Sequence, residues 1–186
     1  MAIIKTIEYN QATGRLKDIY DDLISKRGML AEVHKIQSLR PESIVKHMDL
    51  YLEIMFSKSE LSRAEREMMA VVTSVVNNCH YCQIHHSEAL NNYWKDEERI
   101  LSLQSNFYDA QLSEKEFLLC KFAKNLTLKP LKFKEPEEIN KLKNIGLTDE
   151  AILDATLVVA YFNFVNRIVL GLRVNIESNG ATGYNY

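Results

Sequence analysis

Apolar residues recur along most of the chain at the three- and four-residue spacing of an amphipathic α-helix. The pattern is clearest over residues 41–56, where Pro41 suits a first helical position and the apolar stripe continues to Phe56. A similar stripe over residues 13–26 ends before Gly28, a residue type that commonly stops a helix. No pair of segments carries the alternation and turn that predict a β-hairpin. The pattern therefore predicts an all-α protein.

Two longer segments are apolar on nearly every side, which predicts that they are buried. The first, residues 62–76, opens with the capping-box pattern of Ser62 and Glu65. Its valines also suit a strand, but the cap and the length favour a helix. Within it, Glu67 is either paired at a site or turned to the surface. The second begins after Leu147-Thr148, and we expect it to be central or to lie at a subunit interface.

Shorter helices complete the predicted fold, a compact multi-helix domain over residues 1–177. They are expected within residues 29–38, 96–103, 113–126 and 136–144, the third opened by a second capping box. The Gly- and Asn-rich residues 178–186 are predicted to be a poorly ordered tail. The similar openings Leu61-Ser62 and Leu147-Thr148 suggest an internal duplication.

The composition narrows the class of protein. The 186 residues are 46% hydrophobic and 26% charged, which suits one globular domain with a substantial core. The net charge of −2, with Lys and Arg scattered, argues against a nucleic-acid partner. The N-terminal segment lacks a signal-peptide core, and no run is expected to approach the roughly 18 apolar residues of a membrane span. We expect a cytoplasmic protein that does not enter a membrane.

The candidate catalytic residues follow Asn77-Asn78, where the preceding helix is predicted to end. A second helix opens there with Cys79-His80-Tyr81-Cys82 and continues to His85-His86. At about 100° per residue, Cys82 lies roughly −60° and His86 roughly −20° from Cys79 around the helix axis. Two thiols and one imidazole therefore share a face, while His85 falls near −120°, off that face. This arrangement predicts a dithiol redox centre.

A reactive cysteine must form the thiolate, so the site has to lower the pKa of a thiol from its usual value of about 8.5. A helix N-terminus favours an anion, and the Cys-x-x-Cys spacing itself lowers the pKa. His86 is placed to accept the proton, and Glu67 to orient that base. Because the first cysteine of such motifs lies nearer the helix N-terminus, this logic alone makes Cys79 the attacking sulfur.

Other interpretations of these residues stay open. Cys79, Cys82 and His86 are also plausible zinc ligands, although a closed site needs a fourth, which only His85, His34, His47 or a carboxylate could supply. The two thiols could instead be inert core residues, as we expect for the separate Cys120. His80 and Tyr81 project away from the sulfur face and suit packing or interface positions. Tyr81 and His85 are also candidate secondary residues of the site, and His85 is otherwise expected at the surface.

The spacing of Glu67, Cys79, Tyr81, Cys82 and His86 resembles the signature of the alkylhydroperoxidase D-like members of the carboxymuconolactone decarboxylase family. Flanking segments resemble the peroxidase-related branch of that family, so that the resemblance covers about residues 10–177. They are Leu61-Ser62, Leu112-Ser113, Leu147-Thr148 and the aromatic segment of residues 161–167.

The resemblance implies an all-helical trimer or hexamer that reduces small organic hydroperoxides without haem, flavin or metal, in antioxidant defence. It implies that Cys82 is the peroxidatic thiolate and Cys79 the resolving thiol, with His86 and Glu67 as a proton relay. A partner protein dithiol would reduce the resulting disulfide. The best-known members place a His where this chain has Tyr81, which leaves the relay one base short. Lactone decarboxylases of the family lack the cysteine pair.

Overall fold

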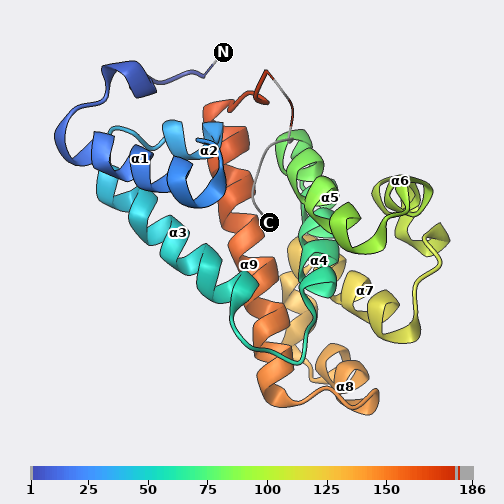
Figure 1. The fold of residues 1–186 in the computed structure, drawn as a ribbon. Helices are drawn as coiled ribbons and strands as arrows, with labels where there is room; N and C mark the ends of the chain where they lie inside the picture. Colours follow the sequence, from blue (N-terminus) through green and yellow to red (C-terminus); the bar gives the residue numbers. More distant parts are fainter. Residues whose placement is uncertain (1, 179, 181–186) are drawn as a thin grey trace.

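The computed structural model describes residues 2–178 and 180, and within them the chain forms helices and no strand (Figure 1). The α-helices are α1 (Gly14–Arg27), α2 (Glu32–Lys35), α3 (Pro41–Phe56), α4 (Arg63–Val76), α5 (His80–Trp94), α6 (Glu97–Asn106), α7 (Glu114–Leu128), α8 (Glu137–Asn144) and α9 (Asp149–Leu172). The 3₁₀ helices are η1 (Tyr9–Gln11), η2 (Phe107–Asp109) and η3 (Pro130–Lys134). The all-α prediction is confirmed. Of the predicted tail, residues 179 and 181–186 lie outside the described residues.

The helix boundaries follow the local signals in the sequence. Helix α1 ends at Gly28, whose φ of 84° lies in the left-handed region that glycine adopts without strain. Pro41 occupies the first position of α3. At the start of α4, the Ser62 hydroxyl accepts from the Glu65 backbone N–H, and the Glu65 carboxylate accepts from the Ser62 N–H. This cap fixes the valine-rich segment as a helix rather than a strand.

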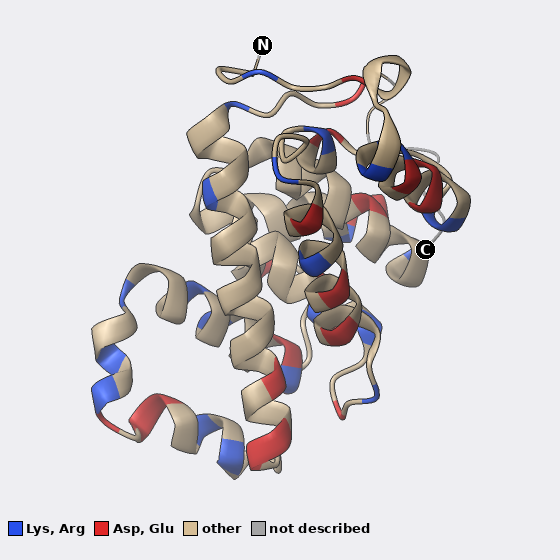
Figure 2. Cartoon of the chain, turned by 90° about the vertical axis from the view of Figure 1, so that its left-hand side faces the viewer, with Lys and Arg blue, Asp and Glu red and all other residues tan. Residues whose placement is uncertain are grey.

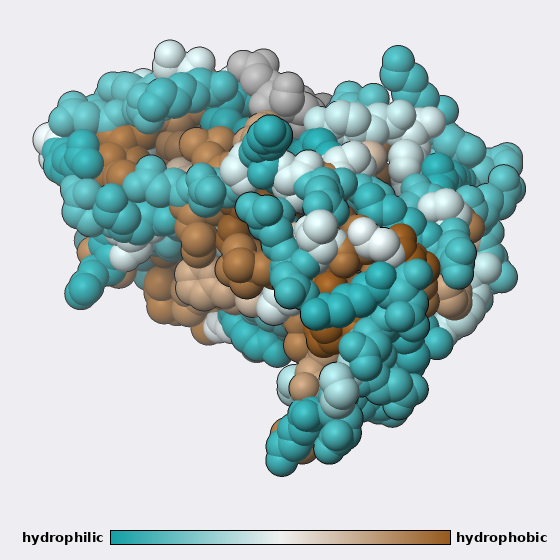
Figure 3. Space-filling view, turned by 90° about the horizontal axis from the view of Figure 1, so that it is seen from below, coloured by the Kyte–Doolittle hydropathy of each residue, from teal (hydrophilic) through white to brown (hydrophobic). Residues whose placement is uncertain are grey.

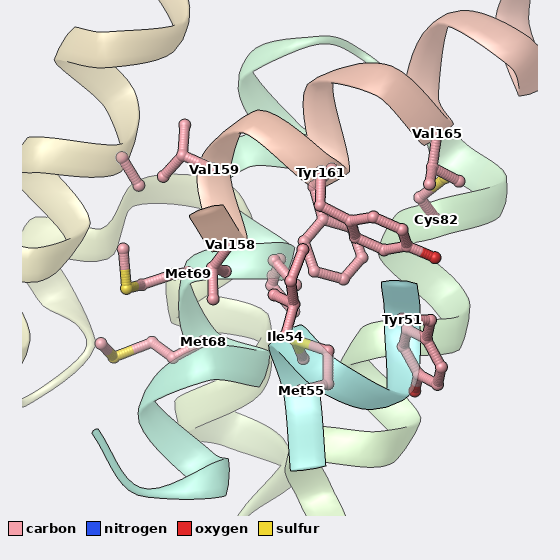
Figure 4. Packing of buried hydrophobic residues seen from close by; sticks show 14 of the residues in the cluster. Tyr51, Ile54, Met55, Met68, Met69, Cys82, Val158, Val159, Tyr161 and Val165 are labelled. Carbon is pink, nitrogen blue, oxygen red and sulfur yellow. The ribbon is translucent and has the colours of Figure 1, made fainter. Parts of the chain in front are cut away.

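Helix α4 lies at the centre of the fold and packs most extensively against α5, α7 and α9 (Figure 1). Met68 and Met69 of α4 are fully buried in the same hydrophobic cluster as Val158 of α9 (Figure 4). Complete burial of one such side chain contributes roughly 1.5–3 kcal/mol, so the α4–α9 contact is a major part of the core. The helices α1 to α3 lie on the other side of α9 from α4 and α5 (Figure 1).

Helix α9 corrects one expectation from the sequence. By length and composition it could cross a membrane, whereas no segment was expected to come near that limit. The helix is nevertheless in the core, since Val158, Val159 and Phe162 have no exposed surface. Other apolar side chains of α9, such as Leu153 and Phe164, are about half exposed. We interpret α9 as a core helix of a soluble domain with one apolar face uncovered.

Charged residues of both signs are mixed on the face drawn in Figure 2, where Lys and Arg alternate with Asp and Glu. Many form exposed ion pairs, such as Arg15 with Glu42. No extended basic region appears on this face. The arrangement agrees with the net charge of −2.

Candidate active site

The two cysteines lie at the turn between α4 and α5. Asn78 turns the chain with a φ of 55°, a left-handed conformation that Asn tolerates better than most residues. The Cys79 backbone N–H then donates to the Ser74 carbonyl, which ties the start of α5 to the end of α4. Cys79 is fully buried, Cys82 is 1% exposed, and their Sγ atoms are 2.9 Å apart. The structure therefore brings the predicted thiol pair together.

The pair favours loss of one proton and opposes loss of the second. The Cys82 thiol, and to a lesser extent the backbone N–H of Cys82, lower the pKa of Cys79 against the effect of burial. The adjacent Cys79 sulfur and burial raise the pKa of Cys82, while the Asn166 amide lowers it. When one cysteine is ionised, the thiol proton of the other stabilises it, so the pair carries a single negative charge.

Glu67 lies directly behind His86. The Glu67 side chain is fully buried, and its Oε2 is 2.7 Å from Nδ1 of His86, whose side chain is 15% exposed. Because a carboxylate only accepts hydrogen bonds, Nδ1 of His86 must carry the proton, which leaves Nε2 as a free base. Burial raises the pKa of Glu67, but His86 and Arg63 outweigh it, and the carboxyl stays ionised with a pKa below its usual value.

Arg63 is a site residue that the sequence reasoning did not identify. Its Nε donates to Oε1 of Glu67 at 2.9 Å, and its guanidinium also bonds the Tyr51 hydroxyl and lies 3.6 Å from the centre of the Phe56 ring. The i, i+4 spacing of Arg63 and Glu67 was the available signal. Arg63 compensates the buried charge of Glu67, so that both carboxylate oxygens have partners.

Cys82 and His86 line a cavity of about 80 Å³ between α5, α9 and the α1–α3 helices. Among the described residues, Cys79 and Glu67 lie behind this wall. The full lining consists of Arg27, Ala31, Val33, His34, His47, Met48, Tyr51, Tyr81, Cys82, His85, His86, Ala89, Tyr161, Phe162 and Val165. A cavity of about 150 Å³ accommodates benzene, so this smaller space, which opens to solvent, suits a small polar group on a short apolar body.

Tyr161 is a second residue that the sequence reasoning left in the core. The Gln37 amide donates to both the Val33 carbonyl and Nδ1 of His47, so Nε2 of His47 carries the proton and donates to the Tyr161 hydroxyl at 2.7 Å. Burial lowers the pKa of His47 to about 4, which keeps the ring neutral.

The Tyr161 proton is then available to the cavity, because within the described residues its hydroxyl has no other hydrogen-bond partner. Figure 4 shows its hydroxyl end on the same side as Cys82. Burial raises the pKa of Tyr161, so the phenol remains a neutral donor. The cavity therefore holds one base, Nε2 of His86, and one oriented donor.

Tyr81 and His85, the predicted secondary residues, both line the cavity and converge on Glu177. The Tyr81 hydroxyl donates to Oε1 of Glu177 at 2.7 Å, and Nε2 of His85 lies 2.8 Å from Oε2. Burial opposes ionisation of Glu177, but His85, Tyr81 and the Glu32 backbone N–H lower its pKa to about 2. His85 is thus a cavity residue rather than a surface one, and the role of Glu177 had no signal in the sequence.

The alternative interpretations find little support in the geometry. Within the part of the chain that the structure describes, no group of three or more His, Cys, Asp and Glu residues is arranged to hold a metal ion. His80 is exposed, and Cys120 is a fully buried core residue, as expected, whose pKa burial raises. An inert role for Cys79 and Cys82 does not explain why Cys82 faces a cavity that also holds His86.

Part of the chain resembles known proteins in sequence. The model of the carboxymuconolactone decarboxylase family matches residues 43–111, which include Glu67, both cysteines of the pair and His86. The uncharacterized protein YdfG of Bacillus subtilis is 25% identical over 138 residues, 72% of this chain and 89% of that protein.

Solved structures share the fold over nearly the whole chain. An uncharacterized peroxidase-related protein from Silicibacter sp. TM1040 has a TM-score of 0.85, is 26% identical and is covered over 98% of each chain. A peroxidase-related protein from Ralstonia eutropha JMP134 with an alkylhydroperoxidase AhpD core has a TM-score of 0.86 at 21% identity, over 96% of this chain and 93% of that one. The debrominase Bmp8 has a TM-score of 0.78 at 18% identity, over 95% and 92%. Residues 43–111 therefore resemble the carboxymuconolactone decarboxylase family, and the whole chain shares the fold of peroxidase-related, alkylhydroperoxidase D-like proteins.

Proposed function

We propose that this protein is a dithiol peroxidase that reduces small organic hydroperoxides in antioxidant defence. The observation that carries the proposal is the contact between the two sulfurs, 2.9 Å apart, with Cys82 on a cavity that it shares with His86. Two relatives named as peroxidase-related support the same class of chemistry. The proposal uses only residues of the chain and no cofactor or metal.

In the first step, Nε2 of His86 accepts the thiol proton of Cys82, and the thiolate attacks the distal oxygen of the hydroperoxide. The S–O bond forms as the O–O bond breaks, which gives a sulfenic acid at Cys82 and an alkoxide. Tyr161 donates a proton to that leaving oxygen, so that an alcohol departs. His86 then returns its proton to the tyrosine oxygen through the solvent of the cavity.

In the second step, the Cys79 sulfur attacks the sulfenic sulfur. The S–S bond forms, and the hydroxyl group leaves as water with the thiol proton of Cys79. A Cβ–S–S–Cβ bridge has an S–S length of about 2.05 Å, so the 2.9 Å separation requires only a small displacement. An external dithiol then reduces the disulfide by thiol–disulfide exchange and is itself oxidised.

The order of the two cysteines rests on access rather than on acidity. The pKa directions place the negative charge on Cys79, yet Cys79 has no exposed surface and lies behind the cavity wall. His86 takes one proton of the pair, and the proton that remains can move across the 2.9 Å contact to Cys79 when a peroxide enters, which leaves the thiolate on Cys82. We therefore assign the attack to Cys82, the sulfur that an oxidant can reach.

The test uses Cys82→Ser, Cys79→Ser and the control Cys120→Ser, each reduced and then exposed to one equivalent of tert-butyl hydroperoxide. We expect the wild type and Cys120→Ser to lose two thiols per chain and to turn over when a dithiol is supplied. Cys82→Ser should not consume peroxide, whereas Cys79→Ser should yield a sulfenic acid that dimedone traps. Equal residual consumption in the two variants would contradict the assignment.

A general thiol–disulfide oxidoreductase is the main alternative within the same chemistry. It would exchange disulfides through Cys79 and Cys82 without consuming peroxide. A non-catalytic helical assembly module, in which the cysteine pair senses redox state or holds a metal, is a third possibility. Disulfide exchange at an intact rate without peroxide consumption would favour the oxidoreductase. Stoichiometric oxidation of the thiols without turnover would favour the non-catalytic module.

Two further parts of the proposal concern the cellular compartment and the oligomeric state. A dithiol reductant and reduced cysteines suit the cytoplasm, where thiols are kept reduced. The uncovered apolar face of α9 suits a homo-oligomer, a trimer or hexamer, and the apolar patches on the face seen in Figure 3 are of the kind that subunits bury. Sedimentation equilibrium would test the assembly, and a monomer at micromolar concentration would contradict it.

A further inference from the structure

The wall of the cavity formed by α1 and α2 has hydrogen-bonding capacity that the peroxide chemistry does not use. His34 of α2 is only 9% exposed, and its Nδ1 has no hydrogen-bond partner among the described residues. Burial, followed by the charges of His47 and Arg27, lowers the pKa of His34 to about 3, so its ring is neutral. A buried nitrogen without a hydrogen-bond partner is unfavourable, and a bound ligand with an acceptor atom would satisfy it.

Arg27 supplies a positive charge on the same wall. It is the last residue of α1 and is partly exposed, so it lies where the cavity meets solvent. Its guanidinium lies over the rings of Tyr51 and Phe56, at 5.3 and 5.9 Å from their centres. Within the described residues, no carboxylate pairs with it, in contrast to Arg63, which is bound to Glu67. Among the described side chains, Arg27 is therefore a cation on this wall without a carboxylate partner.

The other residues that line the cavity determine which chemical groups a ligand can place between this wall and Cys82. Much of it is apolar, from Ala31 and Met48 to Phe162 and Val165. A ligand that suits the whole cavity therefore has an apolar body and, at one end, an anionic group with several acceptor oxygens. Arg bonds a carboxylate through two parallel N–H groups, and His34 can add a third donor from Nδ1.

We propose that Arg27 and His34 form a carboxylate-binding subsite, and that the substrate is a short hydroperoxide bearing a carboxylate at the end opposite the peroxide. The carboxylate lies at the mouth on Arg27 and His34, and the peroxide group reaches Cys82. Reduction then yields the corresponding hydroxy carboxylate and water. The identity of the peroxide end rests on the proposed function, whereas the carboxylate subsite does not.

The binding test measures protection of Cys82 against alkylation by iodoacetamide in the reduced protein, with hexanoate and hexanol as matched probes. Hexanoate should protect at a concentration at least about 10-fold lower than hexanol, the size expected for one charge-assisted hydrogen-bonded pair. Arg27→Gln should remove most of this difference, and Arg27→Lys should restore part of it. Arg15→Gln, an exposed ion-paired arginine on the same helix, should retain it.

The kinetic test compares a carboxylate-bearing hydroperoxide with a neutral one of the same length. We expect a preference of at least about 10-fold in kcat/KM for the acid, reduced in Arg27→Gln. Equal protection by the two probes, or a preference that survives Arg27→Gln, would overturn the subsite while leaving peroxide reduction intact. Hexanoate protection that depends on Arg27 in a protein that consumes no peroxide would retain the subsite and reject the proposed function.

Discussion

Replacing Glu67 by Gln tests the role of the buried carboxylate most directly. The substitution keeps size and shape but replaces one carboxylate oxygen by an NH₂ group. Because Arg63 offers only donors, the amide oxygen must face Arg63 and the NH₂ group must face Nδ1 of His86. His86 is then forced into the other tautomer, with the proton on Nε2. The base on the cavity side is lost although every heavy atom stays in place.

The structure sets the expected magnitudes. Removing one partner of a buried ion pair costs roughly 3–5 kcal/mol, and the hydrogen bond that Gln keeps with Arg63 places the loss near about 3 kcal/mol. A positioned general base contributes roughly 10²–10⁴ in rate, so peroxide consumption should fall at least about 100-fold. The two effects are separable, because stability is measured without substrate and rate is measured on the folded fraction.

Urea unfolding gives the loss of stability, and stopped-flow oxidation of the thiols gives the rate. The matched control is Glu116→Gln, which changes a half-buried carboxylate paired with Arg99, away from the cavity. It should lose about 1 kcal/mol or less and keep its rate. A Glu67→Gln protein with a wild-type rate would refute the tautomer argument, and one with unchanged stability would refute the burial argument.

Two further predictions use other parts of the cavity. Tyr161→Phe should slow reduction of alkyl hydroperoxides by about 10- to 100-fold but slow peroxy acids much less, because a carboxylate leaving group needs no proton; an equal loss with both would show a purely structural role. The pKa values of His34 and His47, lowered to about 3 and 4, mean that the unfolded chain binds protons more readily below pH 6.5. Stability should therefore fall from pH 6.5 toward pH 4.5 by about 2–3 kcal/mol for each ring in urea unfolding. His47→Gln should flatten this dependence and exposed His80→Gln should not, and a slope unchanged in His47→Gln would contradict the assignment.

Much of the fold was predictable because its signals are local. Pro41, Gly28 and the Ser62–Glu65 capping box act within a single helical turn, and each lies where the sequence placed it. The shared face of Cys79, Cys82 and His86 is likewise a property of one helix. The pairing of Glu67 with His86 joins two helices, and it was expected from the family resemblance and from the need for an orienting group, not from spacing.

The rest of the site was not predictable because it depends on long-range packing. The bond between His47 and Tyr161 joins α3 to α9, 114 positions apart, and no periodic pattern encodes it. Glu177 reaches Tyr81 and His85 from beyond the end of α9, across 96 and 92 positions. In the sequence, Arg27 is recognisable only as a basic residue that precedes the glycine at the end of a helix. These residues became candidates only when the packing of α1–α3 against α5 and α9 was known.

The burial of Cys79 and Cys82 has a consequence for how the disulfide of the oxidised protein is reduced. With Cys79 sealed and Cys82 at 1% exposure, a folded reductant cannot bring its own cysteine to bonding distance, about 2 Å, without a transient opening of the shell. Slender dithiols should therefore regenerate the protein faster than bulky ones of equal redox potential. The rate of disulfide reduction would then be set by transient opening of the helices that cover the cavity, and not by the thiol–disulfide exchange itself.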